Sequence, residues 1–306
     1  MRIVSRRSAG RYTIVMLISN GDVPLSELST GVTLAVIVGA LLHAGWNTML
    51  KSSADKQLDT VAISVGAGLA GLAVAPFLPL PSVESLPWLA ASSIVHILYF
   101  VLLAGAYRWG DMSFTYPIMR GGGPLVVAAT SATMFGEVLS VAQTAGVAFI
   151  CVGVVSFSVV RTTNPRAFRR ALAFALGNAL VIATYTVLDA RGARISGSPV
   201  AYAMWFFAVN GVVLYLYGGM RRGAEVPRYL KANVRRMAVG AVCTTGSYAI
   251  ALWAMTQAPV ALVASLRETS VIFVALIGTF FLQERFTVQR AFATLCVLAG
   301  LLALRF

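Results

Sequence analysis

Long apolar runs alternate with short polar connections along almost the whole chain. A helix that spans a bilayer needs about 20 consecutive, mostly apolar residues. Segments of this kind lie at 31–50, 60–80, 88–109, 112–135, 141–160, 169–189, 199–219, 237–257, 259–282 and 287–305. The connections between them are too short to form a separate soluble domain. The pattern therefore predicts an all-α integral membrane protein with ten transmembrane helices.

The apolar segments contain an internal repeat. At a shift of 147 residues, Arg120 falls on Arg267 and Glu137 falls on Glu284. Both matches carry weight because arginine and glutamate are rare inside these segments. The same shift pairs Ala104 with Ala251, Val127 with Val274, Ala128 with Ala275 and Gly153 with Gly300. For both glutamates we expect a structural role at the end of a helix.

The repeat predicts how the chain is organised. Each half holds five helices, and an odd number forces the second copy to cross the membrane in the opposite direction. Secondary transporters built from such inverted repeats place their site at the repeat interface, near the middle of the membrane. We therefore expect a polar N-terminal tail at 1–30, a first five-helix repeat at 31–160 and a second, inverted one at 161–306.

Composition supports a membrane protein. Of the 306 residues 58% are hydrophobic and 11% are charged, and the mean hydropathy is +0.81. Soluble domains are about one quarter charged. In a soluble protein the net charge of +13 would suggest nucleic acid. Here the basic residues lie in short segments between apolar runs, so no nucleic-acid partner is expected. Three cysteines lie inside apolar runs without metal-ligand spacing, at Cys151, Cys243 and Cys296.

The basic residues also bear on orientation. Seven of the 24 lysines and arginines fall on the side of the predicted N-terminus, fifteen fall on the other side, and two lie inside helices. Because cytoplasmic loops carry an excess of Lys and Arg, this count favours both termini outside the cytoplasm. The Arg-rich segment before the first helix favours the opposite orientation, so both stay open.

Two arginines inside the apolar segments are the leading candidates for a site. Ionisable residues within membrane helices are rare and mark pathways or sites. The repeat places Arg120 and Arg267 at related positions, and a guanidinium suits a carboxylate or phosphate. We expect one or both to attract an anionic group in a central cavity. The alternative is a structural ion pair, which the adjacent Glu268 makes plausible.

Gly121-Gly122-Gly123-Pro124 directly follows Arg120. No strand precedes these glycines, so they do not form a phosphate-binding loop. A proline in a helix interior removes a backbone hydrogen bond and kinks the helix. The segment is interpreted either as a broken helix beside a substrate site or as a kink that serves packing alone.

Further polar and aromatic residues are candidates for the cavity wall. His43 and Asn47 share one helix face, with Trp46 between them, and His96 and Tyr99 share another. His43, His96 and Glu268 are candidates for proton coupling, although a satisfied core histidine is the alternative. The two histidines lack a third ligand, so no metal is expected. Aromatic candidates for the wall are Tyr116, Tyr185, Tyr248, Trp205 and Trp253.

Several of these motifs together resemble the EamA-type branch of the drug/metabolite transporter superfamily. They are Tyr116 to Pro124 followed by Gly136-Glu137, and Trp253 to Pro259 followed by Leu266 to Ser270 and Gln283-Glu284-Arg285. His43-Ala44-Gly45-Trp46-Asn47 is similar to the first-helix motif of one subgroup. The resemblance covers 31–306 and is specific for the superfamily, not for a substrate.

The resemblance implies a secondary transporter of the cell's inner or plasma membrane. It implies export or exchange of metabolites without ATP, by alternating access, and cytoplasmic termini. The expected substrate is a small polar metabolite, anionic or zwitterionic, such as an amino acid or a phosphonate-like compound. Other expected partners are membrane lipid and, as an open possibility, a second copy of the chain. No cofactor and no enzymatic activity are expected. The alternative function is a flippase or carrier of a lipid-linked substrate.

Overall fold

The computed structural model describes residues 2–8, 11–17, 28–158, 164–280 and 287–305. The elements are β1 (Arg2–Ser8), β2 (Arg11–Leu17), α1 (Thr30–Lys51), α2 (Lys56–Val74), η1 (Ala75–Phe77), η2 (Val83–Ser85), α3 (Leu86–Trp109), α4 (Met112–Phe135), α5 (Val141–Ser156), α6 (Pro165–Ile195), α7 (Pro199–Arg222), α8 (Glu225–Ala232), α9 (Val234–Met255), α10 (Val260–Arg267), α11 (Ser270–Phe280) and α12 (Val288–Ala303). The protein is thus predominantly helical.

All ten predicted apolar segments lie on helices. In the described residues, seven helical segments are long and apolar enough to cross a membrane, while α5 and α12 are shorter apolar helices. The chain is therefore a membrane protein with several spanning helices. The number of ten spans stays a prediction, as do the two inverted repeats and their boundaries.

Local sequence signals set many helix ends. Side chains of Ser29, Asp55 and Asn164 accept hydrogen bonds from backbone N–H groups in the first turns of α1, α2 and α6. Ser140 and Gln143 form a capping box at the start of α5. The helix α4 ends at Gly136, whose φ of 69° is a left-handed conformation that glycine adopts without strain.

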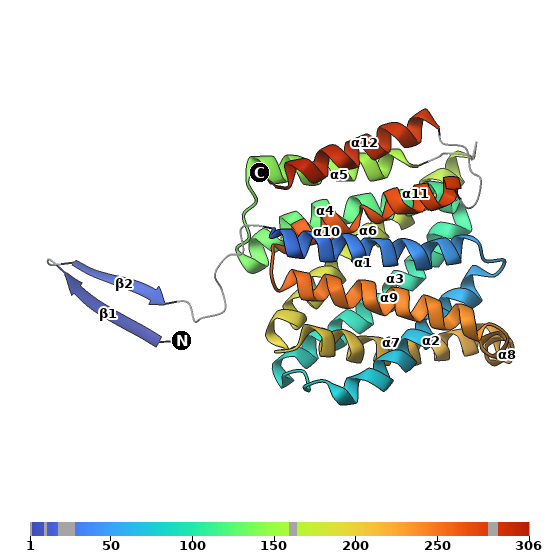
Figure 1. Cartoon of the computed structure of the whole chain (residues 1–306), viewed down its shortest axis with the longest axis horizontal. Coiled ribbons are helices and arrows are strands. Elements are labelled where there is room, and N and C mark those ends of the chain that lie inside the picture. The colour runs from blue at the N-terminus through green and yellow to red at the C-terminus, as the bar shows by residue number, and fades with distance from the viewer. Residues whose placement is uncertain (1, 9–10, 18–27, 159–163, 281–286, 306) are drawn as a thin grey trace.

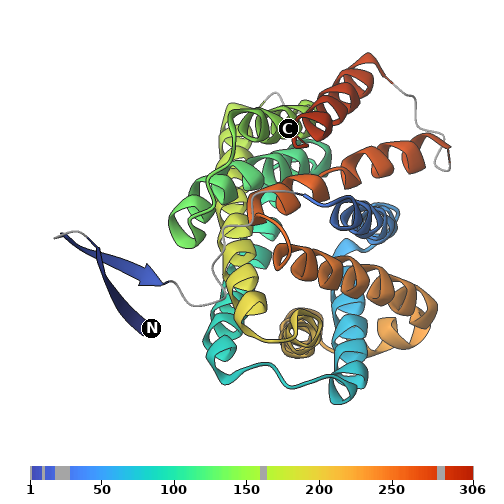
Figure 2. The same ribbon diagram turned by 60° about the vertical axis from the view of Figure 1, so that its left-hand side comes forward.

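The helices pack mainly as pairs of distant segments. Figures 1 and 2 show α5 beside α12 at one edge of the bundle and α2 beside α7 at the other, with α1 packed on α9 between them. A further pair is α3 with α6. If the two predicted halves are exchanged, α1–α9 maps onto α6–α3, and the other two pairs map onto themselves. This pattern is what an inverted repeat would produce.

Glycine allows the closest of these contacts. A Cβ atom on Gly300 of α12 would lie only 2.6 Å from the carbonyl oxygen of Gly146 on α5. Gly153, which the repeat pairs with Gly300, lies in the same α5–α12 contact. In membranes, small residues at such crossings let helix backbones approach closely.

The N-terminal segment, for which the sequence predicts a polar tail, contains two short strands. β1 and β2 form an antiparallel hairpin in which Arg2 pairs with Leu17 and Ser8 pairs with Arg11. In both views it lies apart from the helices (Figures 1 and 2). The segments contain Ile3, Val4 and Tyr12, residue types that favour strands.

Candidate functional site

A cavity of about 160 Å³ lies between α1, α2, α3, α4, α6, α7, α9 and α10. It is therefore lined from both predicted halves of the chain. Apart from Trp205 and Trp253, eleven residues were singled out from the sequence for the site. Ten of these eleven contribute to its wall: His43, Trp46, Asn47, His96, Tyr99, Tyr116, Arg120, Tyr185, Tyr248 and Arg267. Their roles in binding or proton coupling stay predictions.

The eleventh residue, Glu268, stands behind this wall and pairs with Arg120. The Nε atom of Arg120 donates a hydrogen bond to Glu268 Oε2 at 3.1 Å. Its Nη2 atom lies 2.8 Å from Oε1, an ion-pair contact that lacks hydrogen-bond geometry. Both side chains are buried. The charge of Arg120 is thus balanced by a carboxylate from the other predicted half.

Arg267 has no such partner. It is 8% exposed, and among the described residues no carboxylate or carbonyl oxygen binds its guanidinium. Its nearest recorded interaction is with the ring of Tyr248, whose centroid lies 5.5 Å from the guanidinium carbon. A buried charge without a partner is costly. Arg267 therefore stands on the cavity wall as a cation available to a ligand.

The helix break beside the arginines lies in the second half, not in the first. The helix α4 continues through Gly121 to Pro124, while α10 ends at Arg267 and α11 begins at Ser270. In α4, Gly121 packs closely against α5 and Gly122 against α6. The glycines serve packing, and the alternative of a broken helix in this segment is wrong.

The break itself is a short, tight turn. The N–H of Glu268 bonds to the carbonyl of Ser265 at 3.0 Å, and that of Thr269 bonds to Leu266 at 3.1 Å. These are the i to i+3 bonds of a 3₁₀ turn, which inside a longer helix often marks a hinge. The turn directs Glu268 toward Arg120, away from its neighbour in sequence.

Hydrogen bonds join the residues of the first-helix motif to one another and to α4. The indole N–H of Trp46 donates to His43 Nδ1 at 3.3 Å. The amide of Asn47 donates to the His43 carbonyl at 2.7 Å and accepts from the Tyr116 hydroxyl at 2.9 Å. Because an indole N–H can only donate, Nδ1 of His43 is the acceptor. The neutral ring therefore carries its proton on Nε2, which has no partner among the described residues.

The second histidine has the opposite arrangement. Nδ1 of His96 lies 2.9 Å from the carbonyl oxygen of Ser92, so it is the donor there. In the neutral ring, Nε2 is then an acceptor. The imidazole packs 4.0 Å from the ring of Tyr185 and 4.7 Å from that of Phe206, measured between centroids. The centroid of the Tyr99 ring lies 6.1 Å from that of the His96 ring.

Asp189 is more deeply placed than the sequence suggested. It is the last residue of the predicted segment 169–189, but α6 continues to Ile195 and the Asp189 side chain is completely buried. The hydroxyl of Tyr202 donates to Oδ1 at 3.1 Å, and that of Tyr248 donates to Oδ2. Asp189 thus fixes the ring that lies beside Arg267.

Glu137 has the structural role that the sequence predicted. Its Oε1 atom lies 2.5 Å from Nη2 of Arg194, and its Oε2 atom accepts a hydrogen bond at 2.8 Å from the N–H of Val260. Arg194 also bonds to the carbonyls of Met255 and Ala258. These bonds explain why α6 extends past its predicted end. The repeat partner, Glu284, lies outside the described residues.

The cavity extends toward the end of the bundle opposite to the termini. Arg305 bonds to Thr30, so both ends of the helical part lie together. On α1 the lining residues begin at His43 and reach Leu50, one residue before the helix ends. Fifteen basic residues were assigned from the sequence to loops at this far end. An anion that approaches from there meets a positive surface.

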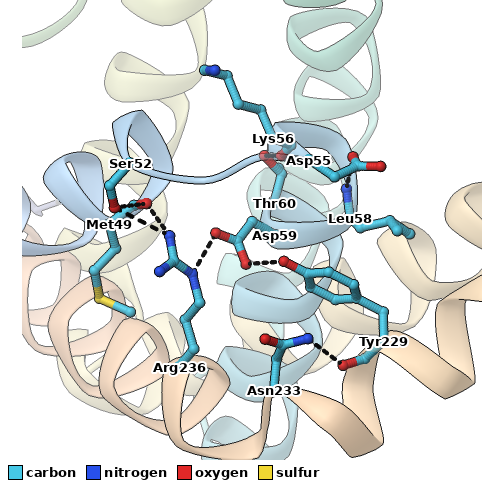
Figure 3. Close-up of polar contacts among 10 residues, drawn as sticks. All are labelled: Met49, Ser52, Asp55, Lys56, Leu58, Asp59, Thr60, Tyr229, Asn233 and Arg236. Carbon is cyan, nitrogen blue, oxygen red and sulfur yellow. Dashed lines mark hydrogen bonds and ion pairs between the residues drawn. The ribbon is translucent and has the colours of Figure 1, made fainter.

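A polar network closes part of this end (Figure 3). Asp59, fully buried on α2, accepts from Nε of Arg236 on α9 at 2.6 Å and from the Tyr229 hydroxyl on α8 at 2.8 Å. Burial and this hydrogen bond raise the pKa of Tyr229. Arg236 also donates to the Met49 carbonyl at the end of α1. The network lies next to Thr60, which lines the cavity.

Some lining residues were missed from the sequence, and two candidates lie elsewhere. The helices α2 and α7 supply Ser64, Phe206 and Asn210, which the sequence analysis did not single out. The amide of Asn210 within an apolar segment was the available signal, because polar groups in membrane helices mark functional surfaces. Trp205 and Trp253 are not part of the wall. No cluster of metal-binding side chains occurs in the described part of the chain.

Comparison with known proteins shows a family and a fold. Residues 169–306, most of the second predicted repeat, match the model of the EamA-like transporter family. No curated protein matches the chain in sequence. Among solved structures 28 chains match. One, a crystal structure described only as that of a protein, is 17% identical with a TM-score of 0.70, and the match covers 89% of this chain and 97% of that one.

Proposed function

We propose that this chain is a secondary transporter of a small organic metabolite with an anionic group. Its residues 169–306 match the EamA-like transporter family, which is part of the drug/metabolite transporter superfamily. Arg267 binds the anionic group. Transport proceeds by alternating access, in which one helix bundle rocks against the other around a fixed site and no ATP is consumed.

The observation that carries this proposal is the difference between the two arginines. Arg120 is neutralised by Glu268, whereas Arg267 is buried on the cavity wall without a counter-charge. Arginine remains charged when buried and presents a planar fork of donors to a carboxylate or phosphate. A bound anion would supply the missing partner, which favours a substrate site over a purely structural role for Arg267.

Three further features support transport of a small solute. The cavity takes residues from both predicted halves, as a site at a repeat interface would. Its volume of about 160 Å³ restricts the solute to a small molecule. Basic loops lie at the end toward which the cavity extends, and they would attract anions from the adjoining compartment.

The experiment is uptake into proteoliposomes that contain the purified full chain. Radiolabelled benzoate, phenylacetate, succinate and alanine are tested one at a time as entering solutes and as exchange partners. At least one anion should enter faster than in protein-free vesicles. The Arg267→Gln variant should lose about 30-fold or more in apparent affinity, because a charge-assisted contact to a buried anion is removed.

Two variants serve as controls. Arg228→Gln removes a charge from the exposed helix α8 and should leave uptake unchanged. Arg267→Lys keeps the positive charge but lacks the planar fork of donors. Its apparent affinity for the anion should lie between those of the parent and of Arg267→Gln. Anion uptake that is equal in the parent and in a correctly folded Arg267→Gln variant would remove the assignment of Arg267. Absence of uptake and exchange for every solute in the panel would count against the proposed substrate class.

A further inference from the structure

The cavity wall offers two donors to an anion. Arg267 supplies an unpaired guanidinium, and His43 supplies a ring nitrogen, Nε2, that carries a proton because Nδ1 accepts from Trp46. Both residues line the cavity. A carboxylate next to them would receive a charge-assisted contact and a neutral donor.

The cavity has no matching place for a positive group. The two carboxylates nearest to the site are already occupied by protein donors: Glu268 by Arg120, and Asp189 by Tyr202 and Tyr248. Among the described residues, no Asp or Glu side chain is part of the wall. An ammonium group in this cavity would be buried beside two guanidinium groups without a counter-charge, which is strongly unfavourable.

Aromatic rings form one part of the cavity wall. Phe206 stacks on Tyr248 with centroids 5.3 Å apart, and His96 packs on Phe206 at 4.7 Å. Tyr248 also lies beneath Arg267. A ligand whose carboxylate contacts Arg267 would therefore place its body along these rings. Aromatic groups prefer such neighbours, and an apolar cavity of about 150 Å³ accommodates one benzene ring.

We infer that the cavity selects a monoanion with a flat apolar body, of the aryl carboxylate class, and rejects the corresponding zwitterion. This inference rests on the proposed transport function and narrows its substrate class, because the sequence left anionic and zwitterionic solutes equally open. It assigns Arg267 and His43 to the carboxylate, and His96, Phe206 and Tyr248 to the ring.

The test measures binding separately from transport. Isothermal titration calorimetry on the full chain in nanodiscs compares phenylacetate, L-phenylglycine, benzylamine and succinate. Phenylglycine is phenylacetate with an added ammonium group, benzylamine carries only the ammonium group, and succinate lacks the ring. Phenylacetate should bind at least about tenfold more tightly than phenylglycine or succinate, and benzylamine should not bind.

Two variants test which residues contact the carboxylate and which contact the ring of the ligand. Arg267→Gln should weaken phenylacetate about 30-fold or more, and Phe206→Ala should weaken it about tenfold without making phenylglycine a better ligand. Arg228→Gln is the matched charge control and should change the affinity for neither phenylacetate nor phenylglycine. Thermal unfolding of each variant in the same nanodiscs verifies that it is folded.

The possible outcomes separate the two proposals. Equal or tighter binding of phenylglycine, or no binding of phenylacetate, overturns the selection of a monoanion. If phenylglycine or succinate is transported in an Arg267-dependent way, the transport function stands while the aryl carboxylate class falls. If phenylacetate binds through Arg267 but neither enters nor exchanges in proteoliposomes, the substrate-class inference holds for binding and the transport of that class is refuted.

Discussion

Arg120 on α4 and Glu268, in the turn between α10 and α11, form a buried ion pair between residues 148 positions apart in the sequence. The pair joins the two predicted halves of the chain at the cavity. Because it consumes the only carboxylate next to Arg267 in sequence, it leaves Arg267 as the uncompensated charge. Arg120, Glu268 and Arg267 together thereby carry one net positive charge.

Removing one member of this pair should destabilise the protein. In Glu268→Gln, Arg120 stays buried without a counter-charge, which costs about 3–5 kcal/mol when a buried pair is broken. Unfolding of the purified protein by SDS in mixed micelles should show the loss. The double variant Arg120→Gln/Glu268→Gln should recover most of it, since neither member of the pair is then left without its partner. A single variant as stable as the parent would show that the pair is not formed.

The two histidines should occupy opposite tautomers. The hydrogen bond from Trp46 places the proton of His43 on Nε2, and the carbonyl of Ser92 places that of His96 on Nδ1. The chain has two histidines, so ¹⁵N-histidine labelling gives two sets of ring signals. We expect one of each tautomer at neutral pH, assigned with a His43→Gln variant. Identical tautomers would contradict the geometry.

Two glycines on α7 should respond differently to alanine. A Cβ atom on Gly211 would lie 2.7 Å from the Cα of Gly68 on α2, whereas a Cβ on Gly219 meets nothing within 4 Å. Gly211→Ala should therefore separate the helices and destabilise the protein by about 1–3 kcal/mol. Gly219→Ala should be neutral or slightly stabilising, because alanine favours helix. SDS unfolding measures both, and equal effects would argue against the close α2–α7 contact.

Glu137 should affect stability without affecting ligand binding. Glu137→Gln removes the ion pair with Arg194 and weakens the hydrogen bond to the start of α10. A loss of about 2–4 kcal/mol is expected, because the partly buried charge of Arg194 is left uncompensated. Neither residue lines the cavity, so phenylacetate affinity should stay within about twofold. A large change in affinity at unchanged stability would oppose the structural role.

The helices and ten of the residues that line the cavity could be predicted from the sequence. Long apolar runs determine where membrane helices lie, because the bilayer leaves few other solutions. Polar groups within those runs are costly, so residues such as His43, Asn47 and Arg120 point to a site before any contact is known. The partner of a charge is different, because it depends on how helices pack. Glu268 is adjacent to Arg267 in sequence, yet the 3₁₀ turn directs it to Arg120.

Three other features could not be predicted for related reasons. The polar residues after Asp189 suggested a loop, but Arg194 is held by distant carbonyls and keeps the segment helical. Gly121 to Pro124 left a broken helix and a packing kink as alternatives, and the packing of α5 and α6 against these glycines supports a continuous α4. The residues of α7 in the wall were overlooked because its apolar sequence resembles a lipid-facing helix. Each depends on contacts between segments far apart in the chain.

The turn at Glu268 and Thr269 has a mechanical consequence. Since α10 ends at Arg267 and α11 starts at Ser270, α11 can tilt without unwinding either helix. Such a tilt would move Glu268 relative to Arg120, while Arg267 stays with the rigid segment that is packed in the core. If Arg267 binds the anion as proposed, occupancy of the cavity and the angle between α10 and α11 would be linked through two adjacent residues, Arg267 at the ligand and Glu268 at its partner Arg120.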